Sequence, residues 1–204
     1  MKNLTLTNLM KENDFYDCCF SEIDYNDVML GEKKFENCKF NNCNFSETKF
    51  LACKFIECDF YNCNLSSAQL DNSTFVEISF IESKLIGINW TKLKWPHIKL
   101  SSPFQFIKSN ISHSSFFELD LSELVIEECK AHDVDFREAD LTGASFVLSD
   151  LEKSLFMHTN LYSADFTNAT NYLIDPTENN IRKAKFSVPD VLNLLHNFEI
   201  EIQS

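Results

Sequence analysis

The segment FENCKFNNCNFSETKFLACKFIECDFYNCNLSSAQL, residues 35–70, has a large apolar residue at every fifth position. Six of these positions in a row are Phe, from Phe35 to Phe60, and Leu65 and Leu70 follow them. We call these fifth positions the slots of the repeat. A regular internal recurrence is the first feature to interpret in a sequence, because missing it misassigns the whole fold.

The recurrence extends well beyond this segment in both directions. Every multiple of five from Phe15 to Leu100 is apolar or aromatic. After residues 101–105, SSPFQ, the phase shifts by one, and the recurrence runs on from Phe106 to Phe166. All 31 slots are filled in this way, although only 44% of the chain is hydrophobic. The repeat is therefore a property of most of the chain.

A period of five fits neither an α-helix nor a flat strand. On a helix each step of five turns by about 500°, so the slots do not form a stripe. On a strand an odd step moves the side chain to the opposite face each time. The chain must change direction once per repeat, and four repeats then close a square coil with its slots pointing inward. The sequence predicts an all-β solenoid of nearly eight coils, stabilised by the stacking of one coil on the next.

In a square coil, residues twenty positions apart should stack in columns. If the phase shift at 101–105 is a one-residue bulge, the order of the columns is kept across it. One column would then be aromatic from end to end, and it would contain Phe15, Phe35, Phe55, Phe75, Trp95, Phe116, Phe136 and Phe156. In another column Ala131 is expected between Ile111 and Leu151.

The position two residues before each slot is a second inward position, and it is expected to be small. Cys, Ala, Ser or Thr fill 19 of these 31 positions, and seven of the eight Cys are among them. A thiol there packs as a compact apolar group, and no CxxC pair suits zinc. We therefore interpret the cysteines as reduced structural thiols. Lys33 also occupies one of these positions, and the pattern does not explain it.

The charge of the chain limits its partners. The formal net charge is −13, which argues against a protein that grips nucleic acid through its phosphates, because such proteins present Lys and Arg patches. The first residues, MKNLTLTNLMKEND, lack the apolar core of a signal peptide, and no stretch approaches the length of a membrane span. We expect a cytoplasmic protein without direct nucleic-acid or membrane binding.

Acidic side chains recur at two outward positions of the repeats. One position contains Glu118, Glu123, Glu128, Asp133 and Glu138, and the other contains Asp120, Asp135, Asp140 and Asp150. Residues 84–108, in contrast, carry five Lys and no Asp or Glu, around Trp90 and Trp95. Two interpretations are open: a solubilising surface, or an ordered acidic face that imitates the phosphates of duplex DNA and binds a partner.

The repeats resemble the pentapeptide-repeat protein family, whose consensus A(D/N)LXX is similar to ADLTG at 139–143, ADFTN at 164–168 and CNFSE at 43–47. This resemblance implies a right-handed quadrilateral β-helix. We divide the chain into an N-terminal cap at 1–14, the β-helix at 15–166 with its phase slip at 101–105, and a C-terminal capping and dimerisation segment at 167–204.

The C-terminal segment contains SVPDVLNLLHNF, residues 187–198, which is typical of a short α-helix with Pro189 in its first turn and Asp190 favourable to its dipole. The preceding NYLIDPTEN, residues 171–179, resembles the tail of the quinolone-resistance (Qnr-like) and microcin-immunity branch of the family. That resemblance implies a homodimer through this end. The apolar residues that we assign to dimerisation are Val191, Leu192, Leu194, Leu195 and Phe198.

The same resemblance implies a function without chemistry. Qnr-like proteins are acidic rods that imitate DNA and bind type II topoisomerases such as DNA gyrase, so this chain would modulate quinolone or toxin sensitivity. It departs from plasmid-type Qnr proteins, which carry two loops, because its only interruption is the slip at 101–105. The alternative is an interaction scaffold that binds an unrelated protein.

An enzymatic function has no support in the residues. The sequence contains no GxSxG, HExxH or glycine-rich phosphate loop. The five His share no column, and none is paired with a Cys at ligand spacing. We therefore expect no catalytic, cofactor-binding or metal-binding residues.

Overall fold

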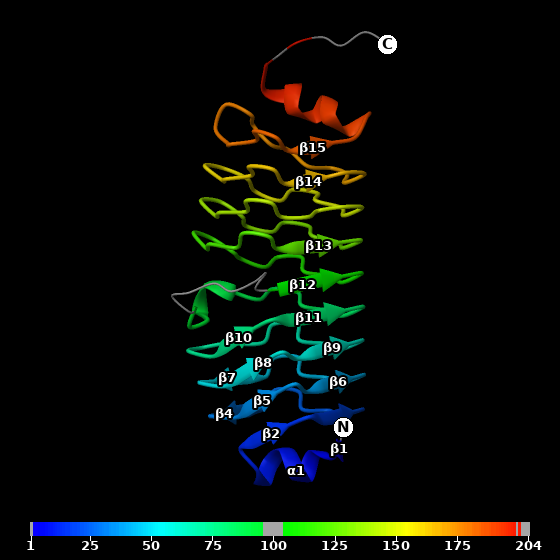
Figure 1. Cartoon of the computed structure of the whole chain (residues 1–204), viewed down its shortest axis with the longest axis vertical. Helices are drawn as coiled ribbons and strands as arrows, with labels where there is room; N and C mark the ends of the chain where they lie inside the picture. The colour runs from blue at the N-terminus through cyan, green and yellow to red at the C-terminus, as the bar shows by residue number, and fades with distance from the viewer. Residues whose placement is uncertain (1, 96–103, 199, 201–204) are drawn as a thin grey trace.

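The computed structural model describes residues 2–95, 104–198 and 200. It is a rod of stacked four-sided coils, with the N-terminus at one end and the C-terminal helix at the other (Figure 1). A coil takes twenty residues, because Phe35 pairs with Phe15 and Phe55 pairs with Phe35 in parallel register. The all-β solenoid expected from the period of five is confirmed. The right-handed quadrilateral β-helix agrees with the solved structures described below.

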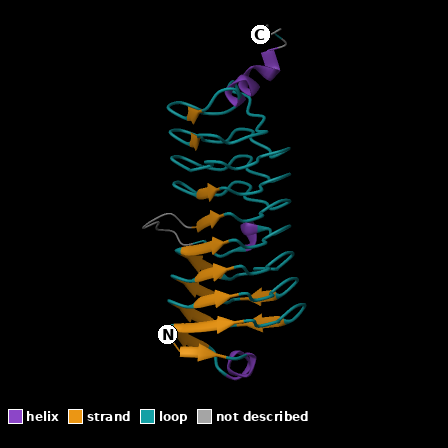
Figure 2. Ribbon diagram, turned by 90° about the vertical axis from the view of Figure 1, so that its right-hand side faces the viewer, coloured by secondary structure: helices purple, strands orange, loops and turns teal. Residues whose placement is uncertain are grey.

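We number the four sides of the coil by the slot residues of one turn: side 1 carries Phe35, side 2 Phe40, side 3 Phe45 and side 4 Phe50. Every strand pair is parallel, and the strands lie mostly in the N-terminal half (Figure 2). Side 1 is the sheet β2 (Asp14–Tyr16), β5 (Lys34–Glu36), β8 (Lys54–Ile56) and β10 (Thr74–Val76). Side 2 is the longest sheet, made of β1 (Lys2–Leu4), β3 (Cys18–Ser21), β6 (Lys39–Asn41), β9 (Asp59–Tyr61), β11 (Ile78–Ile81), β12 (Phe104–Ile107) and β13 (Val125–Glu127). Side 4 contains β4 (Met29–Gly31) and β7 (Lys49–Leu51), and the last pair, on side 2, is β14 (Asp165–Phe166) with β15 (Lys185–Phe186).

Each corner of the coil is formed by a residue with positive φ, two positions after the slot. Twenty-eight non-glycine residues have φ between 50° and 63°, and all of them except Asn171 stand at this corner position. Gly87 and Gly143 occupy the same kind of corner at φ 73° and 69°. The left-handed region is costly for residues with a Cβ atom. The repeat therefore turns by accepting one strained residue in most pentapeptides.

The rod is filled by stacked slot side chains. Side 2 carries the most aromatic column: Phe20, Phe40, Phe60 and Phe80 stack with ring centroids 4.6–5.0 Å apart. Further along this column lies the aliphatic Ile126. Phe146, Phe166 and Phe186 follow it, with successive ring centroids 4.7 and 5.1 Å apart. Apart from the half-buried Trp95, the slots among the described residues are buried almost completely. Stacked rings bury large apolar areas and add about 0.5–1.5 kcal/mol per pair.

The expected column order across the phase slip is wrong. Phe80 pairs with Phe106, 26 positions later, and their rings stack at 5.3 Å. Trp90 likewise stacks on Phe116 at 5.6 Å. Phe116, Phe136 and Phe156 therefore lie on side 4 above Trp90, and do not continue the Phe15 column. Ala131 does lie between Ile111 and Leu151, as expected.

The reason is that a period of five cannot distinguish one extra residue from six, because both shift the slots by one position. The separation of 26 residues is six more than the twenty residues of a regular coil. Trp95 is half-buried against Phe104, with ring centroids 5.5 Å apart, and donates its indole N–H to the Trp90 carbonyl at 3.2 Å. The slot Leu100, His97, Lys99 and residues 101–103 of the slip lie outside the described residues.

The small inward positions behave as expected. All eight cysteines are free, and only Cys19, the one outside this position, is not buried. The Cys53 thiol donates to the Leu30 carbonyl at 3.2 Å, and the Ser73 hydroxyl, one coil later, donates to the Phe50 carbonyl at 2.9 Å. A small polarisable or hydroxyl group thus satisfies a carbonyl of the preceding coil next to the large ring. The cysteines are structural thiols.

Lys33 occupies the same inward position at the open N-terminal end. Its ammonium group is buried and donates to the Glu12 carbonyl at 2.6 Å and to the Asn13 side chain at 2.9 Å. A coil at the end of the rod has no preceding coil to accept these bonds in the usual way. The long side chain of Lys33 reaches the incomplete first coil, which explains why this position is not small.

Both ends of the rod carry helical segments. At the N-terminus β1 pairs with β3, and helix α1 (Leu6–Lys11) buries Leu9. At the C-terminus the pairing of β14 with β15 continues the coil to Phe186. The expected C-terminal helix is present as a 3-10 helix, η2 (Asp190–Phe198), and a one-turn 3-10 helix, η1 (Trp90–Lys92), lies on side 4. The division into cap, β-helix and C-terminal segment stays a prediction.

Candidate acidic interaction surface

The nine acidic residues do not lie on one face. Successive repeats occupy successive sides of the coil, so Glu118, Glu123, Glu128 and Asp133 stand at four different corners. Only the next member, Glu138, returns to the corner of Glu118. A spacing of five shows only that these residues share a position in the repeat. Residues share a face of the rod when they are also a multiple of twenty positions apart. That these nine residues bind a partner stays a prediction, but the geometry distributes them over all four corners of the rod.

Four of the nine residues do come together, at the corner between sides 4 and 1. We call Glu118, Asp120, Glu138 and Asp140 the acidic corner. Asp120 and Asp140 pair as a parallel bridge, and the backbone N–H of Glu118 donates to the Arg137 carbonyl next to Glu138 at 3.1 Å. The two Glu are exposed. The corner therefore presents two carboxylate columns repeated at the coil spacing of about 4.8 Å.

Other acidic residues are partly neutralised by neighbours. The Arg137 guanidinium donates two hydrogen bonds to Asp135, each 2.8 Å, and holds the pKa of that carboxyl below its usual range. His132 contacts Asp150 at 2.6 Å. Partial burial would raise the pKa of Asp150, but hydrogen bonds from Asn171 and His132 lower it overall. Two contacts are longer: Lys108 lies 3.8 Å from Glu128, and His113 lies 3.9 Å from Asp133.

The two outward positions have different structural roles. Asp140 lies one residue before its slot, and its carboxylate accepts from the Thr142 backbone N–H at 2.9 Å and from the Thr142 hydroxyl at 2.6 Å. The same Asx turn recurs at Asp165 and at Asn44, so Asp and Asn stabilise the turn at this position. The position two residues after the slot gains nothing of this kind from Glu. Thirteen of the 28 non-glycine residues with positive φ are nevertheless Asp or Glu, all of them at this position.

Cations lie directly beside the acidic corner. Lys92 and Lys94 are exposed at the same corner one coil earlier, where the Lys94 backbone N–H donates to the Ser73 carbonyl at 2.8 Å. The basic block of residues 84–108 thus interrupts the acidic surface at the corner itself. The sequence could not place these lysines relative to Glu118, because their separation depends on the six-residue offset.

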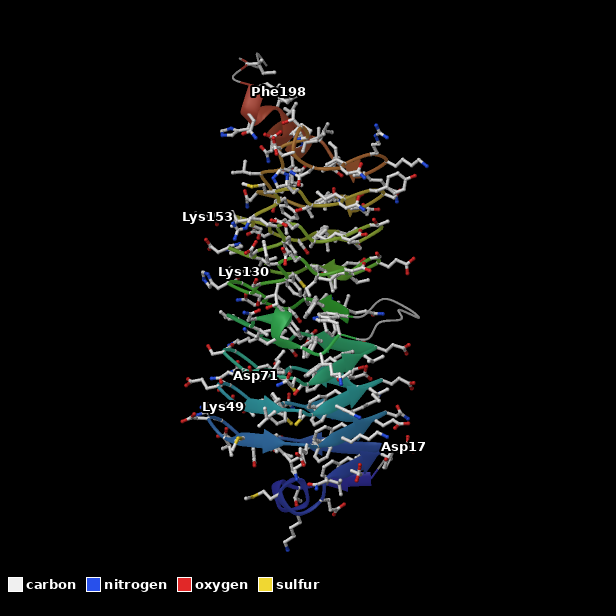
Figure 3. The ribbon with its side chains drawn as sticks, turned by 90° about the vertical axis from the view of Figure 1, so that its left-hand side faces the viewer. Asp17, Lys49, Asp71, Lys130, Lys153 and Phe198 are labelled. Atoms are coloured by element: carbon white, nitrogen blue, oxygen red, sulfur yellow. The ribbon has the colours of Figure 1, made fainter. Side chains whose placement is uncertain are left out.

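The residues assigned to dimerisation lie on η2 at the end of the rod, where Figure 3 shows Phe198. Leu192 and Phe198 are exposed, and Val191, Leu194 and Leu195 are half-buried, with Leu194 packed against the core. Dimerisation through them stays a prediction.

The described part of the chain contains no cluster of three or more His, Cys, Asp or Glu side chains arranged to hold a metal ion. Within the same residues, every helix is too short or too polar to cross a membrane.

Together, the twenty-residue coils, the parallel stacking and the small inward positions define a four-sided β-solenoid built of five-residue repeats. A family model described as a pentapeptide repeat region matches residues 33–103 and 94–166. The chain belongs to the pentapeptide repeat family.

Solved structures of similar fold include two trypsin-treated variants of QnrB1, described as a plasmid-mediated fluoroquinolone resistance protein. One is 17% identical, with a TM-score of 0.60, over 93% of this chain and 100% of that one. The other is 16% identical, with a TM-score of 0.65, over 100% of this chain and 99% of that one. At this identity the likeness concerns the fold. A search of curated proteins found no match.

Proposed function

We propose that this protein is a non-enzymatic acidic DNA mimic that binds a type II topoisomerase, DNA gyrase, and so modulates quinolone or toxin sensitivity. The observation that carries the proposal is the acidic corner. There, two pairs of carboxylates, Glu118 with Glu138 and Asp120 with Asp140, stack along the rod axis over two coils, on a backbone held by the stacked core.

The geometry is comparable with that of a DNA strand. Successive carboxylates in one column are about 4.8 Å apart, and the phosphates of one strand are about 3.4 Å apart along the helix axis. A protein surface that grips duplex DNA with Lys and Arg would meet a similar linear density of negative charge. Such complementarity steers association and selects the partner.

The residue choice at the corners supports a role for the charge. Asn tolerates the left-handed region better than Glu, yet ten of the positive-φ residues are Glu and only six are Asn. The chain therefore uses the less favourable residue repeatedly at its most exposed position. A requirement for negative charge would account for this choice.

The gyrase supercoiling assay tests the proposal, with purified protein titrated in the presence and absence of a quinolone. The informative variant neutralises the acidic corner through Glu118→Gln, Asp120→Asn, Glu138→Gln and Asp140→Asn. We expect this variant to need a protein concentration higher by about tenfold or more for the same effect on gyrase. The matched control changes the charge equally in the N-terminal half, through Glu22→Gln, Glu47→Gln, Glu57→Gln and Glu82→Gln.

A second candidate is an interaction scaffold for an unrelated protein. It is favoured by Lys92 and Lys94, which lie beside the acidic corner, and by the Arg137 cation, which pairs with Asp135. In that case the native protein would leave gyrase unaffected at tens of micromolar, and the two variants would behave alike.

A further inference from the structure

A cleft lies on side 4 at the C-terminal end of the rod, between the last coils and η2. It has a volume of about 250 Å³. Its floor is apolar and comes from Phe156, Met157, Leu173 and Ile174. The bridge between Phe156 and Ile174 sets these two segments side by side. The cleft begins one coil beyond the acidic corner, because the Glu138 backbone N–H donates to the Met157 carbonyl at 2.9 Å, but its apolar floor distinguishes it from that corner.

The floor leaves unusually large apolar side chains in water. Met157 is 50% exposed and Leu173 is 53% exposed, and Leu155, beside Leu173, is 48% exposed. Three such residues on adjacent segments form a contiguous apolar patch. Patches of this kind, when rimmed by polar groups, mark interaction sites.

The rim of the cleft is acidic and ordered. Asp175 accepts hydrogen bonds from the Thr177 backbone and hydroxyl, and from the Asn197 amide at 2.8 Å. The last bond ties η2 across the cleft to the rod. Glu178 is the second carboxylate, and it lies 3.4 Å from His158. Hydrogen bonds from Thr177 are the main reason that the pKa of Asp175 lies below its ordinary value, so this rim is negative at neutral pH.

We infer that this cleft binds an extended segment of another protein that carries an apolar side chain flanked by Lys or Arg. The apolar side chain would fill the floor beside Met157 and Leu173, and the cations would meet Asp175 and Glu178. Buried apolar anchors with a charged rim are the usual division of work in such interfaces. The five residues assigned to dimerisation do not line this cleft, and a second copy placed in it would bring its own acidic rim against Asp175 and Glu178.

The experiment uses the full chain and a fluorescein-labelled probe peptide, Gly-Lys-Leu-Phe-Lys-Gly, with its ends blocked. Binding is followed by fluorescence anisotropy and by amide chemical shifts. Two further peptides separate the contributions: Gly-Glu-Leu-Phe-Glu-Gly reverses the charge, and Gly-Lys-Ser-Ser-Lys-Gly removes the anchor. We expect only the first peptide to bind and to shift the amide signals of residues 155–157 and 173–178.

The variants Leu173→Lys and Glu178→Gln test the floor and the rim separately. We expect each to weaken binding of the basic apolar peptide by about fivefold to tenfold. Leu148→Lys is the matched control, because Leu148 is also 53% exposed but lies at a corner after side 2. Circular dichroism checks that all three variants fold like the native protein.

Four results would overturn the inference. The first is equal binding of the anchor-free peptide, which would mean unspecific attraction to an acidic rod. The second is binding that Leu173→Lys leaves unchanged, and the third is the absence of binding at millimolar peptide. The fourth is a dimer that Leu173→Lys converts to monomer in light scattering, because a second copy would then cover the cleft. None of these results depends on gyrase.

Discussion

At the residue scale, the acidic side chains at the corner positions carry a free-energy penalty, because the backbone there is left-handed. Glu57 has φ 52°, and a side chain beyond Cβ offers nothing to offset the left-handed penalty. We expect Glu57→Asn to be more stable than Glu57→Gln by about 0.5–1 kcal/mol, a part of the 1–2 kcal/mol penalty that Asn offsets locally. Both substitutions remove the charge, so urea unfolding of the pair isolates the backbone effect. Equal midpoints would contradict this explanation.

Lys33 is the second residue with a consequence that can be measured. Lys33→Met keeps the buried stem but leaves the Glu12 carbonyl and the Asn13 side chain without their donor. We expect a loss of about 1–3 kcal/mol in the free energy of unfolding. Hydrogen exchange should show the loss first in the coils nearest the N-terminus. Lys54→Met, at an exposed position of β8, is the control, and an equal effect in both variants would remove the capping role of Lys33.

Inward residues could be predicted from the sequence, but corner conformations could not. Phe, Leu and Cys alternate with polar residues in a pattern that follows from burial alone. The left-handed corners carry Asn, Asp, Glu, Lys, His, Ser and even Leu148, so no residue type marks them. They are imposed by the closure of the coil and its stacking, which override local preference.

At the element scale, β14 and β15 are joined by a charge contact as well as by the backbone. Lys185 donates to Asp165 at 2.9 Å. Partial burial raises the pKa of Asp165, but hydrogen bonds from Thr167 and Lys185 lower it overall. A lowered carboxyl pKa contributes stability above the unfolded value near ~3.9, and this contribution is lost as the pH falls through the folded value.

Asp165→Asn should therefore lower the Tm at pH 7, and the difference from the native protein should shrink as the pH falls from about 5 towards 3. Thermal unfolding followed by circular dichroism at several pH values measures this. Lys185→Met is the partner control, and it should reproduce only the part of the effect that comes from the contact with Lys185. A difference between Asp165→Asn and the native protein that stays constant with pH would exclude the carboxylate as its source.

The continuation of the coil through β15 escaped the sequence because the spacing changes there. Tyr172 and Ile174 are both buried, only two positions apart, and Phe186 stacks on Phe166 at 5.1 Å. Inward residues in this coil no longer recur every five positions, although they fill the same columns. Periodicity detects regular coils and misses an irregular one that stacks on them.

At the scale of the whole molecule, the rod ends in exposed apolar residues of η2. Phe198 is 46% exposed and Leu192 is 44% exposed. If this end forms the proposed homodimer, the double substitution of Leu192→Glu and Phe198→Glu should give monomers by light scattering, because a charge in an apolar interface is unpaired and desolvated. Leu148→Glu should leave the dimer intact. A native protein that is monomeric at micromolar concentration would exclude the dimer.

The order of the columns is the property of the whole molecule that the sequence left undetermined. Lys94 stacks over residue 74, and Phe104 pairs with Ile78. The chain therefore takes ten residues to go from Lys94 to Phe104, whereas the coil below takes only four residues from residue 74 to Ile78. The surplus is six residues, so deleting residues 97–102 should leave a regular coil with the same columns.

We expect this deletion to keep the native far-ultraviolet circular dichroism and a buried Trp90, seen as unshifted tryptophan fluorescence, because the stacked columns on either side are unchanged. Deleting residues 137–142 removes the same number from a regular coil, shifts every later slot by one position and should unfold the C-terminal half. A deletion of residues 97–102 that unfolds as readily as the deletion of residues 137–142 would contradict the six-residue surplus.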